Sequence, residues 1–291
     1  MPWRLRRISA TDKFKTEKVS IRVAHEEIRL AYIARRGQGR GVMFIHGMGS
    51  SRMAFLPLLQ QFPTKHPLYA LDLPGFGASS LPRERQAVGD YVAAVLGFMD
   101  ALGLHRPILV GHSFGGMVAA ETAILEPKRV FGVFLVASAG WTAPRNVMQP
   151  GPSVCLNRLG IWITGSDWFG KRMVNHLGMD ARMLSAADRR RLRYGWRHAH
   201  EMARMGRFYE SKDMAGRLQR SKVPAIVLAG SRDPLFPLDE VKRVVGDRFR
   251  LWVMEGVGHL PIDQRPEEFR ELLHQALTQL ESVGRLRSED R

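Results

Sequence analysis

The sequence predicts an α/β protein built on a mostly parallel, doubly wound sheet. Two observations lead to this fold class. Short, uniformly apolar runs recur along the chain, and stretches with helical periodicity separate them. Such runs are too short for helices and suit strands that are covered on both faces, as in a parallel sheet. The alternation of strand and helix favours helices packed on both sides of that sheet.

The first expected elements are antiparallel. Residues Val19–Ala24 and Ile28–Ile33 alternate apolar and polar side chains, which predicts an N-terminal antiparallel hairpin. The parallel strands are expected at Val42–Ile45, Leu68–Leu71, Ile108–Val110, Val130–Val136, Ala225–Leu228 and Leu251–Met254. The helices are expected at Ser51–Phe62, Gln86–Leu102, Phe114–Leu125, Leu238–Val245 and Pro266–Val283.

The alternation stops between residues 141 and 215. This stretch contains no strand-like run and holds four of the six tryptophans. Its stretch Asp188–Gly206 has helical periodicity, with apolar and arginine-rich faces on opposite sides. We therefore expect residues 1–140 and 216–291 to form one α/β core, with residues 141–215 inserted as a helical cap.

Composition and targeting signals narrow the class of protein. The chain has 291 residues and a single cysteine, Cys155, which rules out an internal disulfide framework and indicates a reducing compartment. No apolar run reaches the length of a transmembrane helix, and the basic start lacks the apolar stretch of a secretory signal. We expect a soluble cytoplasmic protein.

The net charge of +16 is concentrated in two segments, residues 1–40 and 141–215, each of which carries +7. A solvated surface is the favoured interpretation, because net charge by itself says little about function. Weak contact with an anionic membrane surface is the alternative. We expect no nucleic-acid partner, and the sequence leaves the oligomeric state undefined.

The strongest local signal for chemistry is Gly111-His112-Ser113-Phe114-Gly115-Gly116, between an expected strand and an expected helix. Glycines on both sides of a serine permit a sharp strand-to-helix turn that exposes the hydroxyl. A glycine-rich turn with an incidental serine is the alternative. The context favours Ser113 as a nucleophile, with the Phe114 amide at a helix N-terminus where an oxyanion is stabilised.

A serine nucleophile needs a base and an acid that orients the base. His259 follows the apolar run Leu251–Met254, and Asp233 follows the run Ala225–Leu228. Both therefore lie at the carboxyl ends of expected strands, on the same sheet edge as Ser113, where open α/β sheets bind ligands. Asp263 is the competing acid, and we expect it to cap the helix from Pro266 instead.

The remaining histidines near strand ends, His46 and His112, adjoin tight turns and are expected to make structural hydrogen bonds. A second oxyanion donor is expected at the Met48 amide, in the glycine-rich turn after the first parallel strand. The cap should roof this edge of the sheet. Its tryptophans and the residue after the histidine supply the candidates for substrate contact, namely Trp141, Trp162, Trp196 and Leu260.

Five blocks in this order, HGMGSS, DLPGFGAS, GHSFGG, GSRDPLFP and GVGHLP, make the chain resemble the α/β-hydrolase superfamily, specifically its capped serine esterase and lipase-like branch. The resemblance spans about Val19 to Val283. It implies the α/β-hydrolase fold, a triad of Ser113, Asp233 and His259, and an oxyanion hole at Met48 and Phe114. It also implies no metal and no organic cofactor.

The expected activity is hydrolysis of a carboxylic ester, thioester or lactone with a hydrophobic acyl or aryl group, through an acyl-enzyme. Methionines in the cap favour a hydrophobic pocket of irregular shape. Two alternatives stay open. A carbon–carbon bond hydrolase of aromatic degradation shares the triad, although such enzymes tend to have asparagine where this chain has His112. A binding protein that has kept the fold is the other, because fold does not imply function.

Overall fold

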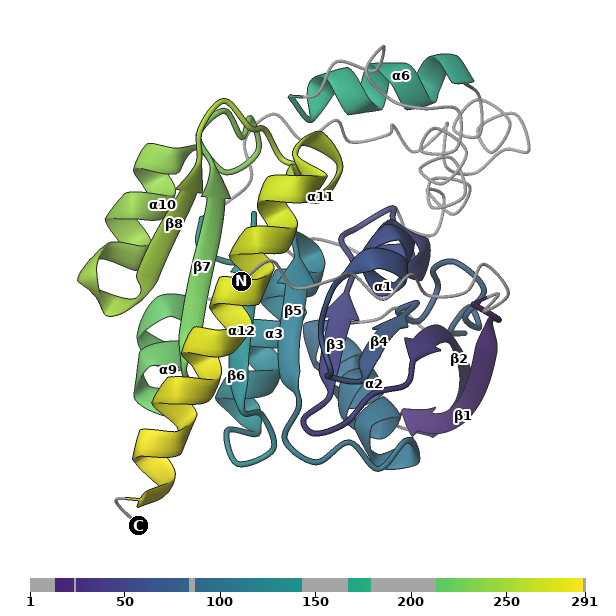
Figure 1. Cartoon of the computed structure of the whole chain (residues 1–291). Coiled ribbons are helices and arrows are strands. Elements are labelled where there is room, and N and C mark those ends of the chain that lie inside the picture. The colour runs from purple at the N-terminus through teal and green to yellow at the C-terminus, as the bar shows by residue number, and fades with distance from the viewer. Residues whose placement is uncertain (1–13, 24, 84–86, 143–166, 179–212, 290–291) are drawn as a thin grey trace.

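A single mixed sheet forms the centre of the protein (Figure 1). The computed structural model describes residues 14–23, 25–83, 87–142, 167–178 and 213–289. Within these residues the strand order is β1-β2-β4-β3-β5-β6-β7-β8. The strands are β1 (Glu17–Val23), β2 (Glu26–Arg35), β3 (Val42–Ile45), β4 (Leu68–Leu71), β5 (Ile108–His112), β6 (Gly132–Val136), β7 (Ala225–Gly230) and β8 (Arg250–Met254).

Strand pairing confirms the predicted architecture. β1 pairs antiparallel with β2, and β2 pairs antiparallel with β4. The other neighbours are parallel, from β4 and β3 through to β8. The chain passes from β3 outward to β4 and then returns to β5 on the other side of β3, so a switch point lies between β3 and β5. Ligands bind at such points, beyond the carboxyl ends of the strands.

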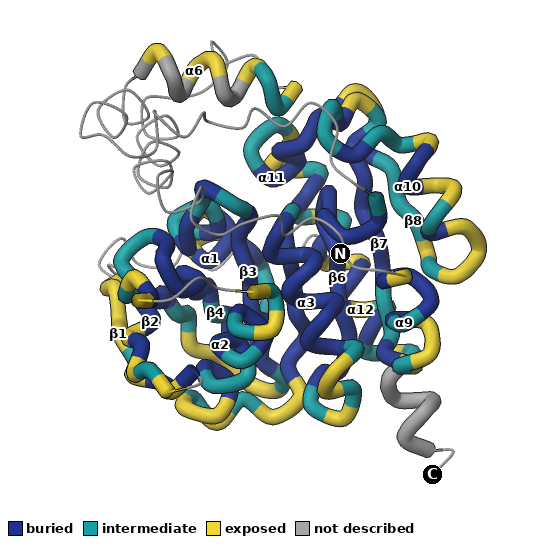
Figure 2. The backbone as a smooth tube through the Cα atoms, turned by 180° about the vertical axis from the view of Figure 1, so that it is seen from behind, coloured by how far each residue is buried: buried dark blue, intermediate teal, exposed yellow. Residues whose placement is uncertain are grey.

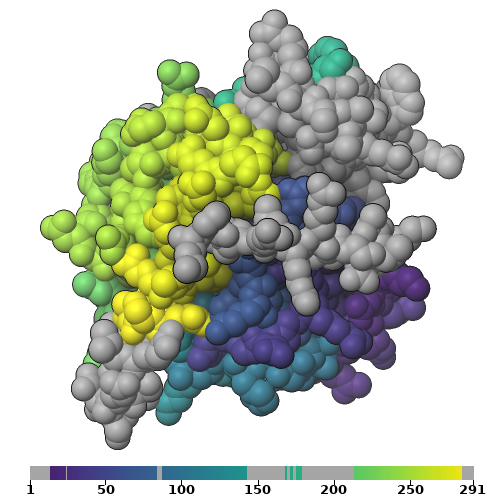
Figure 3. Space-filling view, in the orientation of Figure 1, coloured from purple at the N-terminus to yellow at the C-terminus, as the bar shows by residue number. Residues whose placement is uncertain are grey.

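The helices connect and cover these strands. They are η1 (Arg52–Phe55), α1 (Leu56–Gln61), α2 (Val88–Ala101), α3 (Phe114–Leu125), α6 (Asp167–His176), α9 (Met214–Ser221), α10 (Leu238–Val245), η3 (Gly246–Arg248), α11 (Pro261–Gln264) and α12 (Pro266–Glu289). Helices α1 and α12 lie on one face of the sheet, and α12 with α11 forms much of the surface seen in Figure 3. Along the described ranges, no helix is long and apolar enough to cross a lipid bilayer.

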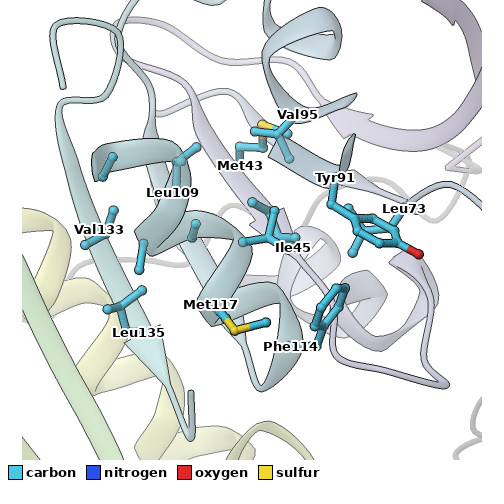
Figure 4. Close-up of a cluster of buried hydrophobic side chains, with 14 of the residues drawn as sticks. Met43, Ile45, Leu73, Tyr91, Val95, Leu109, Phe114, Met117, Val133 and Leu135 are labelled. Atoms are coloured by element: carbon cyan, nitrogen blue, oxygen red, sulfur yellow. The ribbon is translucent and has the colours of Figure 1, made fainter. Parts of the chain in front are cut away.

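Alternate residues of the central strands supply two separate cores. Met43 and Ile45 of β3 face the cluster formed with α2, α3, α9 and α10, whereas Val42 and Phe44 face the cluster formed with α1 and α12. Successive side chains of a strand point to opposite faces, so a fully apolar strand such as β3 is buried on both. Figure 4 shows part of the first cluster, and Figure 2 shows that the buried residues follow the strands and the inner sides of the helices.

The predicted cap is described only in part. Helix α6 lies beyond the carboxyl edge of the sheet (Figures 1 and 2). Residues 143–166 and 179–212 lie outside the described residues, so the extent of the insertion stays a prediction. Met214 and Ala215, which the sequence assigned to the cap, begin α9 and belong to the core cluster that includes α3.

Candidate active site

Ser113 occupies the turn between β5 and α3. Its backbone has φ 54° and ψ −120°, a conformation that non-glycine residues adopt rarely. Hydrogen bonds hold the turn in this state. The Ser113 amide donates to the Val136 carbonyl at 3.0 Å, and the Ser113 carbonyl accepts from Gly116 at 2.9 Å and from Ala139 at 3.0 Å. The end of β6 thus fixes the backbone from which the hydroxyl projects.

Glycines let α3 approach the strands closely at this turn. A Cβ at Gly111 would lie 2.3 Å from the Gly115 carbonyl oxygen, and a Cβ at Gly115 would lie 2.2 Å from the Ile45 carbonyl oxygen. Neither position has room for a side chain. The first turn of α3 is therefore packed directly on β3 and β5, which aims the helix N-terminus at the carboxyl edge of the sheet.

His259 and Asp233 meet Ser113 at this edge. The His259 Nε2 atom lies 2.9 Å from Ser113 Oγ, and its Nδ1 atom lies 2.8 Å from Asp233 Oδ2. In the neutral ring, Nδ1–H donates to the carboxylate while Nε2 accepts from the serine hydroxyl. The structure therefore joins the three predicted residues in one hydrogen-bonded chain, in the geometry that lets an imidazole take a proton from an alcohol.

The loops that hold the acid and the base are also joined to each other. Asp233 Oδ1 accepts from the amides of Leu235 at 2.8 Å and Phe236 at 3.1 Å, so the carboxylate is fixed within its own loop. The neighbouring Arg232 amide donates to the Val257 carbonyl at 2.8 Å, two residues before His259. The side chains of Asp233 and His259 are 1% and 4% exposed, so water does not screen their interaction.

The turn after β3 lies beside the serine. The Ser50 amide donates to the Gly47 carbonyl at 3.1 Å, which closes a turn over Met48 and Gly49. A Cβ at Gly47 would lie only 2.9 Å from the Ser113 Cβ. Within the described part of the chain, the Met48 amide donates no hydrogen bond to another backbone carbonyl. The amides of Met48 and Phe114, both predicted as oxyanion donors, thus belong to the two turns that meet at Ser113.

Two buried histidines support these turns. His112 Nε2–H donates to the His259 carbonyl at 2.8 Å, and burial together with the adjacent His259 lowers the pKa of His112 to about 3. His46 Nδ1–H donates to the Gly47 carbonyl at 2.8 Å, while its Nε2 accepts from the Leu73 amide at 3.1 Å. Burial lowers the pKa of His46 as well. Both side chains make hydrogen bonds to the backbone, as the sequence predicted.

Arg52 is a supporting residue that the sequence analysis missed. Its guanidinium forms an ion pair with Asp72, and its amide donates to the same carboxylate at 2.6 Å. Asp72 also accepts from the Ala78 amide at 2.8 Å, within its own loop. The pair connects the chain after the Gly47 turn to the loop after β4. The residues around Arg52 in the sequence do not indicate that its partner is Asp72.

Two of the four predicted substrate contacts, Trp141 and Leu260, lie in the described part of the chain. Trp141 packs in the hydrophobic core with its ring 6.1 Å from that of Phe249, which precedes β8 and so lies toward the opposite edge of the sheet. Apolar packing accounts for the position of this ring, and its contact with substrate stays a prediction. Leu260 is 7% exposed and belongs to neither core cluster. Trp162 and Trp196 lie outside the described residues.

Asp263, the competing acid, lies inside α11, and its expected role as a cap of the helix from Pro266 stays a prediction. His259 Nδ1 contacts Asp233 instead. Among the described residues, no group of three or more His, Cys, Asp or Glu side chains is arranged to hold a metal ion.

Comparison with known proteins agrees with this arrangement of strands. The profile of the Alpha/beta hydrolase family matches residues 42–272, from β3 into α12. The chain belongs to the α/β hydrolase family. The match includes all three residues of the Ser113 hydrogen-bonded chain, and it confirms the family resemblance and the fold class predicted from the sequence.

Relatives of this α/β hydrolase include esterases. The pimeloyl-[acyl-carrier protein] methyl ester esterase of Aeromonas salmonicida is 27% identical over 253 residues, which cover 83% of this chain and 96% of the relative. A dihydrolipoyllysine-residue acetyltransferase component of the acetoin cleaving system of Cupriavidus necator is 38% identical over 114 residues, and the match spans 30% of that protein and 39% of this chain.

Solved structures share the fold of this α/β hydrolase. Esterase RhEst1 from Rhodococcus sp. ECU1013 has a TM-score of 0.74 at 20% identity, covering 91% of this chain and 99% of that one. The meta-cleavage product hydrolase from Pseudomonas fluorescens IP01 has a TM-score of 0.69 at 23% identity, covering 90% and 97%. At these identities the likeness shows the fold alone.

Proposed function

We propose that this α/β hydrolase is a serine hydrolase that transfers an acyl group from an ester-type substrate to water. The observation that supports the proposal most directly is the continuous chain from Ser113 Oγ through His259 to Asp233, with distances of 2.9 and 2.8 Å. A serine hydroxyl is a poor nucleophile unless a base accepts its proton. His259 is already hydrogen-bonded for that transfer, and Asp233 holds the ring in the tautomer that accepts it.

The proposed reaction has two halves. Ser113 Oγ forms a bond to the substrate carbonyl carbon while its proton passes to His259 Nε2. The negative oxygen accepts hydrogen bonds from the amides of Met48 and Phe114. The bond to the leaving alcohol or thiol then breaks, and His259 returns the proton to it. Water attacks the acyl-enzyme with His259 as base, which releases the acid and restores the Ser113 hydroxyl.

The acyl group is proposed to be hydrophobic, of medium chain length or aromatic. Leu260 next to the base is a buried apolar side chain outside both core clusters. The partly buried side chain of Met48 belongs to the adjoining turn. Esterase names among the relatives agree with a carbonyl substrate of this kind.

The test combines a fluorophosphonate probe with p-nitrophenyl esters of increasing acyl length. We expect the probe to label the wild type and not Ser113→Ala, and ester turnover to be lost in that variant while its circular dichroism is unchanged. Undiminished turnover in Ser113→Ala would remove the serine from the mechanism, and an unlabelled wild type would favour the binding-protein alternative.

Rates should rise from acetate toward medium-chain or aromatic esters, and a peak at acetate would contradict the hydrophobic pocket. Thioesters and lactones complete the series. Preference for a meta-cleavage product, the substrate in the name of the Pseudomonas structure, over every ester would instead favour the carbon–carbon bond hydrolase alternative.

A further inference from the structure

The end of the α6 segment, defined here as Asp167–Gly178, lies directly against the loop that holds His259. The His259 amide donates to the Leu177 carbonyl at 2.9 Å. The next carbonyl, that of Gly178, accepts from Gln264 Nε2 at 2.9 Å. The other end of the same side chain, Gln264 Oε1, accepts from the Gly258 amide at 2.8 Å. One glutamine thus bridges the α6 segment and the residue before His259.

Close backbone contact accompanies these hydrogen bonds. Gly178 has φ +80°, and a Cβ there would lie 3.2 Å from the Arg232 carbonyl oxygen and 3.3 Å from the Gly258 Cα. A Cβ at Gly258 would lie 2.7 Å from the Leu177 carbonyl oxygen. The α6 segment is therefore in tight contact with both the acid loop and the base loop. A left-handed glycine on one side and a glycine on the other make this approach sterically feasible.

The backbone of His259 is held from two directions. On the core side, His112 Nε2–H donates to the His259 carbonyl at 2.8 Å. On the other side, the His259 amide donates to Leu177. The first contact is fixed by β5 and the serine turn, whereas the second depends on where the α6 segment lies. Proton transfer from Ser113 requires the ring at hydrogen-bond distance, and a displacement of 1 Å costs on the order of 10²-fold in rate.

We propose that Gln264 is a positioning residue that couples the α6 segment to His259, so that the base is aligned with Ser113 only while Leu177 and Gly178 lie against its loop. This inference rests on the proposed function, because alignment with Ser113 matters only if the serine reacts. Gln264 acts through the backbone of the base loop and touches neither Ser113 nor the reacting atoms.

The two ends of Gln264 explain why an amide is needed. The Gly258 amide requires an acceptor, and the Gly178 carbonyl requires a donor. Glutamate at this position would keep the acceptor but place a second acceptor against the Gly178 carbonyl. Methionine has a similar shape and lacks both the strong donor and the strong acceptor of the glutamine amide. Gln264→Glu therefore breaks the link to the α6 segment alone, whereas Gln264→Met breaks both links.

The test measures ester hydrolysis and amide hydrogen exchange on the full chain. In Gln264→Met and Gln264→Glu we expect kcat to fall about tenfold, which is less than the 10²-fold cost of a 1 Å displacement. KM should stay within about twofold of the wild-type value. We also expect faster exchange of the His259 amide. The control is Gln275→Met, because Gln275 is an exposed glutamine on α12.

A second variant keeps the test valid if Gln264 variants fold poorly. Gly178→Ala places a methyl group against the Arg232 and Gly258 backbones, and its matched control is Gly39→Ala, at φ +82° with no atom within 4 Å of the added Cβ. Both changes carry similar backbone strain, so kcat should fall in Gly178→Ala only.

Wild-type kcat in Gln264→Met, or faster exchange without a fall in kcat, would overturn the proposal.

Fluorophosphonate labelling of the wild type separates failure of this proposal from failure of the proposed function. A wild type that fluorophosphonate fails to label at Ser113 defeats the proposed function, and with it the catalytic half of this inference. The exchange rate of the His259 amide still reports whether Gln264 holds the loop.

Discussion

His112 is expected to make the protein less stable as the pH falls below neutrality. The imidazole is buried beside His259, near Asp233 and His46, and its pKa is lowered from the usual 6.5 to about 3. Burial is the main cause, because the charged ring would lose its hydration. His112→Gln removes the titrating group from the turn that holds Ser113 while keeping a side chain that can donate a hydrogen bond.

The sign follows from the two pKa values. Between pH 6.5 and about 3 the unfolded chain binds a proton at this position and the folded chain does not. The contribution of the neutral His112 ring to the free energy of unfolding is therefore fully present above pH 6.5 and is lost as the pH falls. Each pH unit in this window lowers the free energy of unfolding by about 1.4 kcal/mol. His112 alone therefore lowers it by about 2 kcal/mol between pH 7 and pH 5.

Urea unfolding at pH 7 and pH 5 measures this effect. The wild type should lose free energy of unfolding between the two pH values, and His112→Gln should lose about 2 kcal/mol less over the same interval. His105→Gln is the control, because it removes a histidine at an exposed position. An identical loss in His112→Gln and the wild type would refute the reasoning, since it would mean that burial does not keep this imidazole neutral.

Three further changes test the site. Asp233→Asn should lower kcat for ester hydrolysis by about 10⁴-fold through loss of the correct histidine tautomer, and kinetics within tenfold of the wild type would contradict that role. Arg52→Met leaves the buried Asp72 carboxylate without its ion pair and should lower the free energy of unfolding by about 3–5 kcal/mol in urea titrations. Gly47→Ala places a Cβ 2.9 Å from that of Ser113, so the two turns must shift apart, and kcat should fall by about 10²-fold. A wild-type kcat would exclude the Gly47 turn from the site.

Local patterns were sufficient to predict most elements. The expected bounds Val42–Ile45, Leu68–Leu71, Phe114–Leu125 and Leu238–Val245 are those of the structure. The C-terminal helix extends beyond its expected end at Val283 to Glu289. These elements could be predicted because burial on both faces produces uniformly apolar strands, and burial on one face produces helical periodicity.

Side-chain directions and cross-chain contacts were less predictable. Trp141 looked like a cap residue because it follows the last regular strand before the insertion, yet its ring packs against Phe249 in the core. Arg52 and Gln264 gave no signal, because each acts through partners that the sequence does not indicate. Their contacts depend on which loops the sheet brings together.

The sequence by itself determined which residues can perform chemistry and which turns expose them. The glycine spacing around Ser113 and the apolar runs before Asp233 and His259 are local patterns, and they can be recognised without knowledge of the fold.

The tertiary structure decided that these side chains meet, across separations of 146 residues between Ser113 and His259 and 26 between Asp233 and His259. It also decided that the α6 segment lies against the base loop. The physical reason is that hydrogen bonds of 2.8–2.9 Å require strand order, loop packing and backbone approach to be satisfied together.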